Sequence, residues 1–348
     1  MRQGSEASIV AVVQVESDTG AAVRAAMEAA AIERFVAAGA RIAVKPNLGW
    51  DLFIPGSITS PAVLAAVLDQ LAGRAAELVV IEADQVLENV HSVYQRCFAA
   101  LCRERGISFV NMSRAARRTV ELEGAGALHR VTLSEALEGR SLVTVPVMKT
   151  HDKTGLSGAI KNQWGCLPET RHNYHLVIDP ALVDILRLTR PAFGVVDATV
   201  ALEGNGPKTG RPKIMNLILA SGDPVALDAV QAYLMGFEAG EVEHVRLCGE
   251  AGLGEHRLDK IVVRGPALEP LRRPFRRAGH NFVSQVELTL RRSLLRPLVF
   301  HTPLFDLMAL GAKLWYHAWS WFGPRRRLWR EALRHPLYGP QWSCARKS

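Results

Sequence analysis

The sequence predicts an α/β fold, with a mostly parallel sheet flanked by helices and a helical, basic and aromatic appendage at the C-terminus. Apolar runs rich in β-branched residues alternate with helical patterns through residues 1–265, as in sheets wrapped by helices. The 348 residues are 48% hydrophobic and 22% charged, which predicts a large buried core and excludes a disordered protein. We therefore divide the chain into an α/β catalytic-type domain, 1–265, and a tail, 266–348.

The expected strands are short apolar runs that suit a sheet buried on both faces. They cover residues 8–15, 41–44, 78–81, 107–110, 141–147, 193–196, 214–220 and 261–263. Helical spacing predicts helices over 21–37, from residue 60 onward, and over 92–105, 180–188 and 224–234. Ser60 and Asp223 each precede a proline, as an N-cap does when proline takes the first helical position. Gly39 and Gly106 are the expected helix stops.

Polar clusters follow several of these strands. In parallel sheets, ligands collect beyond the carboxyl ends of the strands, so these clusters are candidate site residues. The alternative is that strand ends are polar in any case. The clusters are Lys45-Pro46-Asn47, Glu82-Ala83-Asp84, Lys149-Thr150-His151 and Asp197.

The stretch 149–175 is the richest in chemistry, because it combines basic side chains with glycines and few acids. Glycines that let the backbone approach a ligand, flanked by Lys and Arg, are typical of a phosphate or carboxylate pocket. We expect Lys149 to donate a proton or clamp the anion, and His151 to act as general acid/base. Residues that would bind or orient the anion are Lys45, Asn47, Gly158, Lys161, Asn162 and Arg171.

The same stretch contains a candidate metal site. His172 and His175 are three residues apart and would share one face of a helix, so that with His151 they would offer three imidazoles to a divalent metal. The alternative is that each histidine is an ordinary hydrogen-bonded residue.

A glycine-rich loop at 202–210 follows the strand that ends near Asp197, and it carries Glu203 as a further candidate base or metal ligand. Neither a P-loop nor a G-x-G-x-x-G motif occurs, so we expect no Rossmann-type NAD site. The cysteines include no C-x-x-C pair, so no cysteine-ligated iron–sulfur cluster is expected either.

In their order along the chain and in their residues, these motifs resemble those of the family known as domain of unknown function 362. The resemblance rests on Val44-Lys45-Pro46-Asn47, Thr59-Ser60-Pro61, Lys149-Thr150-His151, Gly158-Ala159-Ile160-Lys161-Asn162, Trp164-Gly165, Val196-Asp197-Ala198, Glu203-Gly204-Asn205-Gly206-Pro207 and Gly222-Asp223-Pro224-Val225-Ala226-Leu227-Asp228. Many members carry a ferredoxin-like iron–sulfur domain, which implies redox chemistry. This chain lacks the ferredoxin cysteines, so the resemblance implies electrons from a partner protein.

The tail differs from the rest of the chain in charge and aromatic content. Residues 266–348 hold 15 Lys+Arg and 4 Asp+Glu, a net charge of +11, and five of the seven tryptophans. The run 303–322 is long enough to span a bilayer, but Asp306, Lys313 and His317 make a span costly. Aromatic residues beside arginines favour an interfacial helix on an anionic membrane surface. The alternatives are that the tail packs on the α/β domain or binds another subunit. A nucleic-acid partner is not expected.

Three functions follow as expectations. The first is an enzyme that is cytoplasmic and peripheral on the inner face of the membrane. It would act on an anionic amphipathic or lipid-linked substrate, and the resemblance to the family implies a reductive step with electrons from a partner. The second is a metal-dependent isomerase or lyase that uses the three histidines. The third is a non-catalytic factor that delivers a ligand to a membrane complex.

Overall fold

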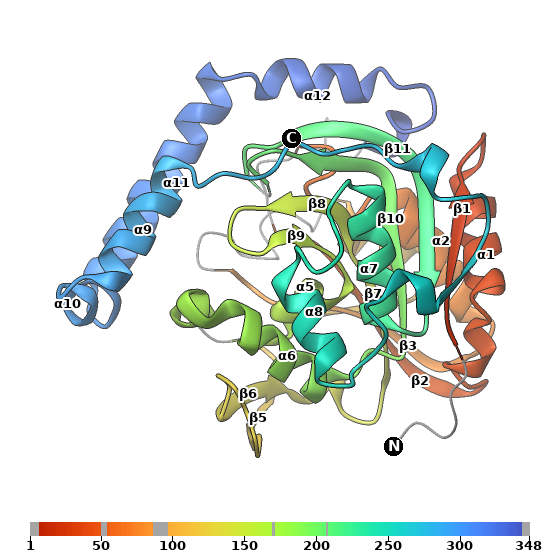
Figure 1. The fold of residues 1–348 in the computed structure, drawn as a ribbon, viewed down its shortest axis with the longest axis horizontal. Helices are drawn as coiled ribbons and strands as arrows, with labels where there is room; N and C mark the ends of the chain where they lie inside the picture. Colours follow the sequence, from red (N-terminus) through yellow and green to blue (C-terminus); the bar gives the residue numbers. More distant parts are fainter. Residues whose placement is uncertain (1–6, 50–53, 86–96, 169–170, 207, 343–348) are drawn as a thin grey trace.

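The computed structural model describes residues 7–49, 54–85, 97–168, 171–206 and 208–342, and it confirms the α/β fold (Figure 1). Its strands are β1 (Ser8–Gln14), β2 (Ala40–Pro46), β3 (Ala75–Glu82), β4 (Ser108–Asn111), β5 (Arg117–Glu121), β6 (Arg130–Ser134), β7 (Ser141–Val145), β8 (Val147–His151), β9 (Gly155–Ser157), β10 (Phe193–Glu203), β11 (Arg211–Ser221) and β12 (Ile261–Arg264). The helices of the α/β domain are α1 (Thr19–Ala29), α2 (Pro61–Ala72), α4 (Phe98–Glu104), α5 (Ala159–Asn162), α6 (Ile178–Thr189), α7 (Pro224–Leu234) and α8 (Glu243–Glu250).

Ten of these strands form one mixed sheet in the order β12-β1-β11-β10-β7-β2-β3-β4, with β8 paired to β10 and β9 paired to β8. Most neighbours run parallel, including the run β10-β7-β2-β3-β4. Strand β11 runs antiparallel to both β1 and β10, and β9 runs antiparallel to β8. The carboxyl ends of β2, β3 and β8 consequently lie at the same edge of the sheet, where a ligand site is expected.

Helices cover both faces of the sheet, which explains why its strands read as continuous apolar runs. Within β1, Val10 and Val12 pack into the core on the side of α7, whereas Ala11 packs on the side of α1 and α2. This alternation follows from the two-residue period of a strand, and all three side chains are fully buried.

The capping signals are confirmed. The Ser60 hydroxyl accepts a hydrogen bond from the backbone N–H of Val63, and Pro61 takes the first position of α2. The Asp223 carboxylate accepts from the N–H groups of Val225 and Ala226 at the start of α7.

The structure differs from the expectations in three places. Lys149 and His151 lie within β8, which begins after Pro146, rather than in a loop beyond a strand. Residues 117–134, for which no strand was predicted, contain the hairpin β5–β6. Helix α1 ends at Ala29, well before the expected stop at Gly39. Of the helix expected over 92–105, the described part is α4; residues 92–96 lie outside the described residues.

The short helix α5 is fixed to α7 by a buried carboxylate. Asp228 accepts hydrogen bonds from the N–H groups of Ala159 (2.6 Å) and Ile160 (2.9 Å). Gly158 makes this approach possible, because a Cβ at that position would lie 2.1 Å from Asp228 Oδ1. Burial raises the pKa of Asp228 to about 7. Asp228 thereby sets the position of Lys161 and Asn162, which belong to α5.

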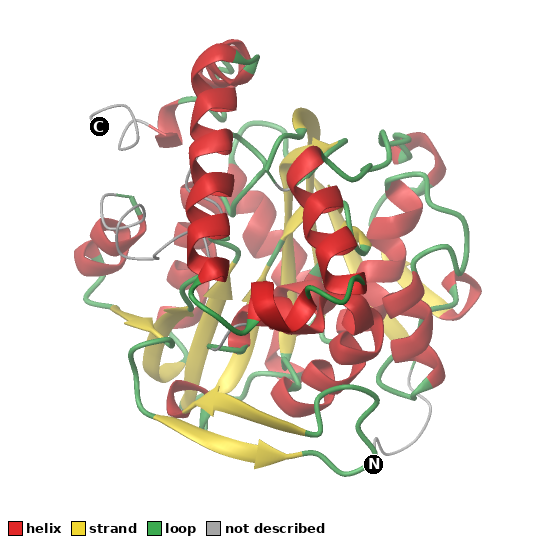
Figure 2. Cartoon of the chain, turned by 90° about the vertical axis from the view of Figure 1, so that its left-hand side faces the viewer, coloured by secondary structure: helices red, strands yellow, loops and turns green. Residues whose placement is uncertain are grey.

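The tail is helical, as expected. It forms α9 (Phe282–Arg292), α10 (Arg296–Phe300), α11 (Leu304–Phe322) and α12 (Arg325–Leu333). The first three make an arm along one side of the α/β domain, and α12 runs across one end of it (Figures 1 and 2). No helix in the described part of the chain is both long and apolar enough to cross a bilayer.

The tail packs on the α/β domain through a few aromatic side chains. Tyr316, Tyr338 and Trp342 are 2%, 1% and 3% exposed and belong to the same core cluster as α1 and α2. The Tyr338 hydroxyl donates a hydrogen bond to Asn216 Oδ1 (2.9 Å), which ties the C-terminal segment to β11.

We predict that Gly158→Ala lowers the free energy of unfolding by about 1–3 kcal/mol, because the added methyl group must push Asp228 away from α5. Urea denaturation measures the change. Gly73→Ala is the control, since Gly73 is exposed with φ −72° and a Cβ there would meet no described atom within 4 Å. Equal stability of wild type and Gly158→Ala would contradict the close approach.

Candidate functional site

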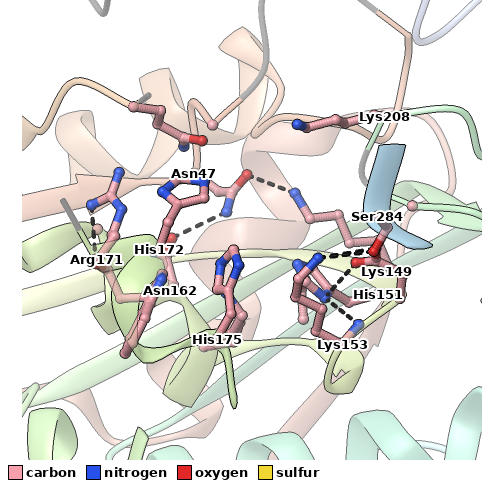
Figure 3. A pocket seen from close by; sticks show the side chains of 18 of the residues that line it. Asn47, Lys149, His151, Lys153, Asn162, Arg171, His172, His175, Lys208 and Ser284 are labelled. Atoms are coloured by element: carbon pink, nitrogen blue, oxygen red, sulfur yellow. Dashed lines mark hydrogen bonds and ion pairs between the residues drawn. The ribbon is translucent and has the colours of Figure 1, made fainter. Parts of the chain in front are cut away.

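A pocket of about 150 Å³ opens at the carboxyl ends of β2, β3 and β8, between α5 and the arm. Its described lining is strongly basic, with six Lys or Arg side chains against three Asp or Glu (Figure 3). Nine of the residues expected from the sequence line it: Lys45, Asn47, Lys149, His151, Lys161, Asn162, Arg171, His172 and His175. The sheet edge therefore brings together side chains that are up to 130 positions apart in the sequence.

The floor of the pocket is a buried ion pair. Lys45 Nζ lies 3.0 Å from Glu82 Oε1, and both side chains are almost fully buried. Asn162 Oδ1 accepts hydrogen bonds from Lys45 Nζ and from Asn47 Nδ2, each at 3.3 Å, while Asn162 Nδ2 donates to the backbone of Lys45. Gly165 closes over the pair, because a Cβ there would lie 2.5 Å from Lys45 Nζ.

Lys149 is held above this floor by neutral acceptors. Its Nζ donates to Asn47 Oδ1 (2.8 Å; Figure 3). It also donates to the backbone carbonyl of Ser57 (2.7 Å). Burial, reinforced by the positive charge of Lys45, lowers the pKa of Lys149 to about 7. An ammonium group with this pKa can release or take up a proton at neutral pH.

Lys161 and Arg171 add two further cations. Burial and the charges of Arg171 and Lys149 lower the pKa of Lys161 to about 7. Arg171 donates only to neutral carbonyl groups in its described hydrogen bonds, those of Trp164, Leu167 and Asp84. Its guanidinium group thus orders the loop after α5 and leaves its positive charge available to the pocket.

The surroundings of His151, the expected general acid/base, favour its neutral form. Burial and the charges of Lys161, Lys153 and Lys149 hold the pKa of His151 well below its usual range. Its Nδ1 accepts a hydrogen bond from the backbone N–H of Lys153 (3.1 Å), so we assign the proton to Nε2. The groups of this pocket that titrate near neutral pH are therefore lysines rather than this histidine.

The structure does not assemble the three histidines into a metal site. The rings of His172 and His175 lie 4.6 Å apart, but His175 Nδ1 is bound to Glu287 Oε1 (2.6 Å). Within the described residues, no three His, Cys, Asp or Glu side chains are arranged so as to hold a metal ion. His172 Nδ1 is buried and has no hydrogen-bond partner in the described part of the chain.

Three expected site residues lie outside the pocket because each is satisfied elsewhere. Gly158 packs against Asp228, whose carboxylate also accepts hydrogen bonds from the N-terminal amides of α5. Asp197 accepts from the Ser60 N–H and the Thr199 hydroxyl, and burial raises its pKa. Glu203 pairs with Lys213 at 3.1 Å.

Five tail residues that were not predicted from the sequence complete the pocket: Asn281, Val283, Ser284, Glu287 and Tyr316. Ser284 Oγ accepts a hydrogen bond from Lys153 Nζ (2.9 Å), and Asn281 Nδ2 donates to the Tyr316 hydroxyl (3.1 Å). Glu287 could have been predicted from the sequence. It is one of only four acidic residues in the basic tail, which marks it as a candidate for an ion pair with basic side chains.

Comparison with known families agrees with the motifs. Residues 42–233 match the family model described as domain of unknown function (DUF362), which covers more than half of the chain. The chain belongs to the DUF362 family. The matched segment of this DUF362 protein includes β2, β3, β8 and α5, which form the floor and walls of the pocket, but not the arm.

A thylakoid-associated protein from Synechocystis sp. is 28% identical over 207 residues, 56% of this chain and 63% of that protein. The DUF362 chain thus spans less than two thirds of that relative. Among solved structures, a Thermotoga maritima protein is 11% identical with a TM-score of 0.38, over 67% of this chain and 58% of that one. The lactate racemase apoprotein from Thermoanaerobacterium thermosaccharolyticum is 12% identical with a TM-score of 0.40, over 67% and 57%. Both TM-scores are below 0.5, so neither structure is informative about activity.

We predict that Lys149→Met changes stability in a pH-dependent way. In wild type, the folded state holds the Lys149 proton only below its pKa of about 7, whereas the unfolded chain holds it up to the ordinary lysine pKa of 10.5. The free energy of unfolding of the wild type therefore rises with pH above 7. Relative to Lys149→Met, the wild type gains about 2–3 kcal/mol of stability between pH 7 and pH 9.

Urea denaturation at pH 7 and pH 9 measures this difference, and the exposed Lys260→Met is the control. If the free energies of unfolding of Lys149→Met and wild type differ by the same amount at both pH values, the pKa of Lys149 is not lowered by burial.

Proposed function

We propose that this DUF362 protein is an enzyme of the membrane surface that binds the anionic group of an amphipathic or lipid-linked substrate in its cationic pocket. Lys161 carries this proposal. Its Nζ lines the pocket 5.5 Å from the ring centroid of Trp164, and no carboxylate or hydrogen-bond acceptor among the described residues binds it. Lys161 is half-buried, so its ammonium group is partly removed from water, and an anionic ligand would offset the cost of that desolvation.

The chemistry that the pocket favours is proton transfer next to the bound anion. Lys149 and Lys161 both have pKa values of about 7, so each can act as acid or base at neutral pH. A phosphate or carboxylate would interact with Lys161 and Arg171, while Lys149, oriented by Asn47, would face the reacting part of the substrate. The reductive step expected from the family's ferredoxin fusions stays a prediction.

The outer face of α11 supports a membrane location. Leu307, Leu310 and Leu314 are 63%, 53% and 61% exposed, and Trp321 on the same face is 65% exposed. An apolar helix face beside arginines is typical of a helix that lies in the interface of an anionic bilayer. The thylakoid association of the Synechocystis relative supports the same location.

We predict that Lys161→Met weakens the binding of small anions roughly ten- to hundredfold, because a buried charged hydrogen bond is lost. Isothermal titration calorimetry with inorganic pyrophosphate and with oxalate at pH 6.5 measures the effect and separates phosphate from carboxylate preference. Lys260→Met serves as the matched control. If the wild-type protein binds neither anion, or if Lys161→Met binds both as tightly, the anion pocket is not the site we propose.

We predict that the triple variant Leu307→Glu/Leu310→Glu/Leu314→Glu loses binding to vesicles of phosphatidylglycerol and phosphatidylcholine by about a hundredfold or more. Three leucines can no longer enter the interface, at about 1.5–3 kcal/mol each. Co-sedimentation measures the loss, and Val262→Glu, which changes an exposed valine on β12, is the control. Co-sedimentation of the triple variant at wild-type levels would exclude α11 as the membrane contact.

A further inference from the structure

Glu287 is an acidic side chain that the arm inserts into the basic pocket. It lies on α9, and its carboxylate is 2.6 Å from His175 Nδ1 and 3.3 Å from Lys153 Nζ. Its side chain is only 19% exposed. Burial would raise its pKa, but the His175 hydrogen bond and the charge of Lys153 prevail and hold the pKa of Glu287 well below its usual range. Glu287 is therefore an anion bound inside the pocket.

Two of the groups that bind Glu287, Lys153 and His175, come from the α/β domain and suit an anion from any source. The third, Arg291, lies on α9 itself. Lys153 offers an ammonium group, and His175 donates from Nδ1. The neighbouring His172 adds a buried Nδ1 to which no described residue is hydrogen-bonded. The Glu287 carboxylate thus occupies an anion-binding position formed by Lys153 and His175. His172 Nδ1, next to this position, is without a hydrogen-bond partner among the described residues.

We propose that Lys153, His175 and His172 form a second anion subsite, for a phosphate or carboxylate group of the substrate, which Glu287 fills as an internal competitor. The proposal rests on the proposed function, since it assigns a second anionic contact to the same substrate. The substrate would then carry at least two anionic groups. One would bind near Lys161, and the other would displace Glu287.

Release of Glu287 would not leave its charge without a partner. Arg291, one turn further along α9, already lies 2.9 Å from the same carboxylate, and this pair would leave the pocket together with the helix. On the pocket side, α9 also contacts Lys153 through the hydrogen bond to Ser284. Displacement of Glu287 by a substrate anion would thus loosen α9 and enlarge a pocket of about 150 Å³, which is smaller than the ~300 Å³ or more of most ligand sites.

The test compares Glu287→Gln, which keeps the shape and removes the charge, with Glu331→Gln. Glu331 is an exposed acid of α12 that pairs with Arg327, so both variants remove one tail carboxylate from a helical ion pair. Calorimetry with inorganic pyrophosphate gives the dissociation constants. If Glu287 fills the subsite in about nine molecules of ten, Glu287→Gln lowers the dissociation constant about tenfold, while Glu331→Gln leaves it unchanged. The double variant Lys153→Met/Glu287→Gln should lose this gain.

Hydrogen exchange of the wild-type protein provides a second measurement that needs no folded variant. Pyrophosphate should speed amide exchange in α9, and slower exchange there would overturn the proposal. Equal affinity of wild type and Glu287→Gln would also overturn it while leaving the anion pocket intact. Absence of pyrophosphate binding in wild type and in both single variants would instead overturn the proposed function, and this inference with it.

Discussion

The site depends on the buried ion pair between Lys45 and Glu82. The two residues lie at the ends of neighbouring parallel strands, and removal of either would leave an uncompensated charge inside the protein. The pair also fixes Asn162 and requires a glycine at position 165. Because Glu82 is engaged with Lys45, it does not pair with Lys149, whose described partners are neutral. The positive charge of Lys149 is therefore not neutralised by Glu82, and the pocket stays basic.

Much of the fold could be predicted because its signals are local. Apolar runs marked the strands, and Ser60 and Asp223 marked two helix starts through caps that depend only on the next few residues. The pairing of β11 antiparallel to β1 and β10 is set by contacts that no local pattern records. For the same reason the approach of Asp228 to Gly158, about 70 residues away, could not be read from either residue.

Two local signals located part of the site. Lys45, Asn47 and Lys149 were found from their place at or near strand ends, and Lys161, Asn162 and Arg171 from the basic, glycine-rich stretch 149–175. Position at a strand end did not distinguish them from Asp197, whose carboxylate is fully used by Ser60 and Thr199. The missing wall comes from the tail, and its contribution depends on a helix returning over the sheet edge from more than 100 residues beyond β8.

Helix α11 has two different faces, one buried and one exposed and apolar, which explains why the composition of the tail supported conflicting interpretations. On α11, Tyr316 is buried against the α/β domain and lines the pocket, whereas Leu307, Leu310 and Leu314 face outward. The buried face of α11 and the Glu287 carboxylate of α9 both belong to the pocket lining, so the arm shapes the site through an aromatic ring and through the ion pairs with Lys153 and His175.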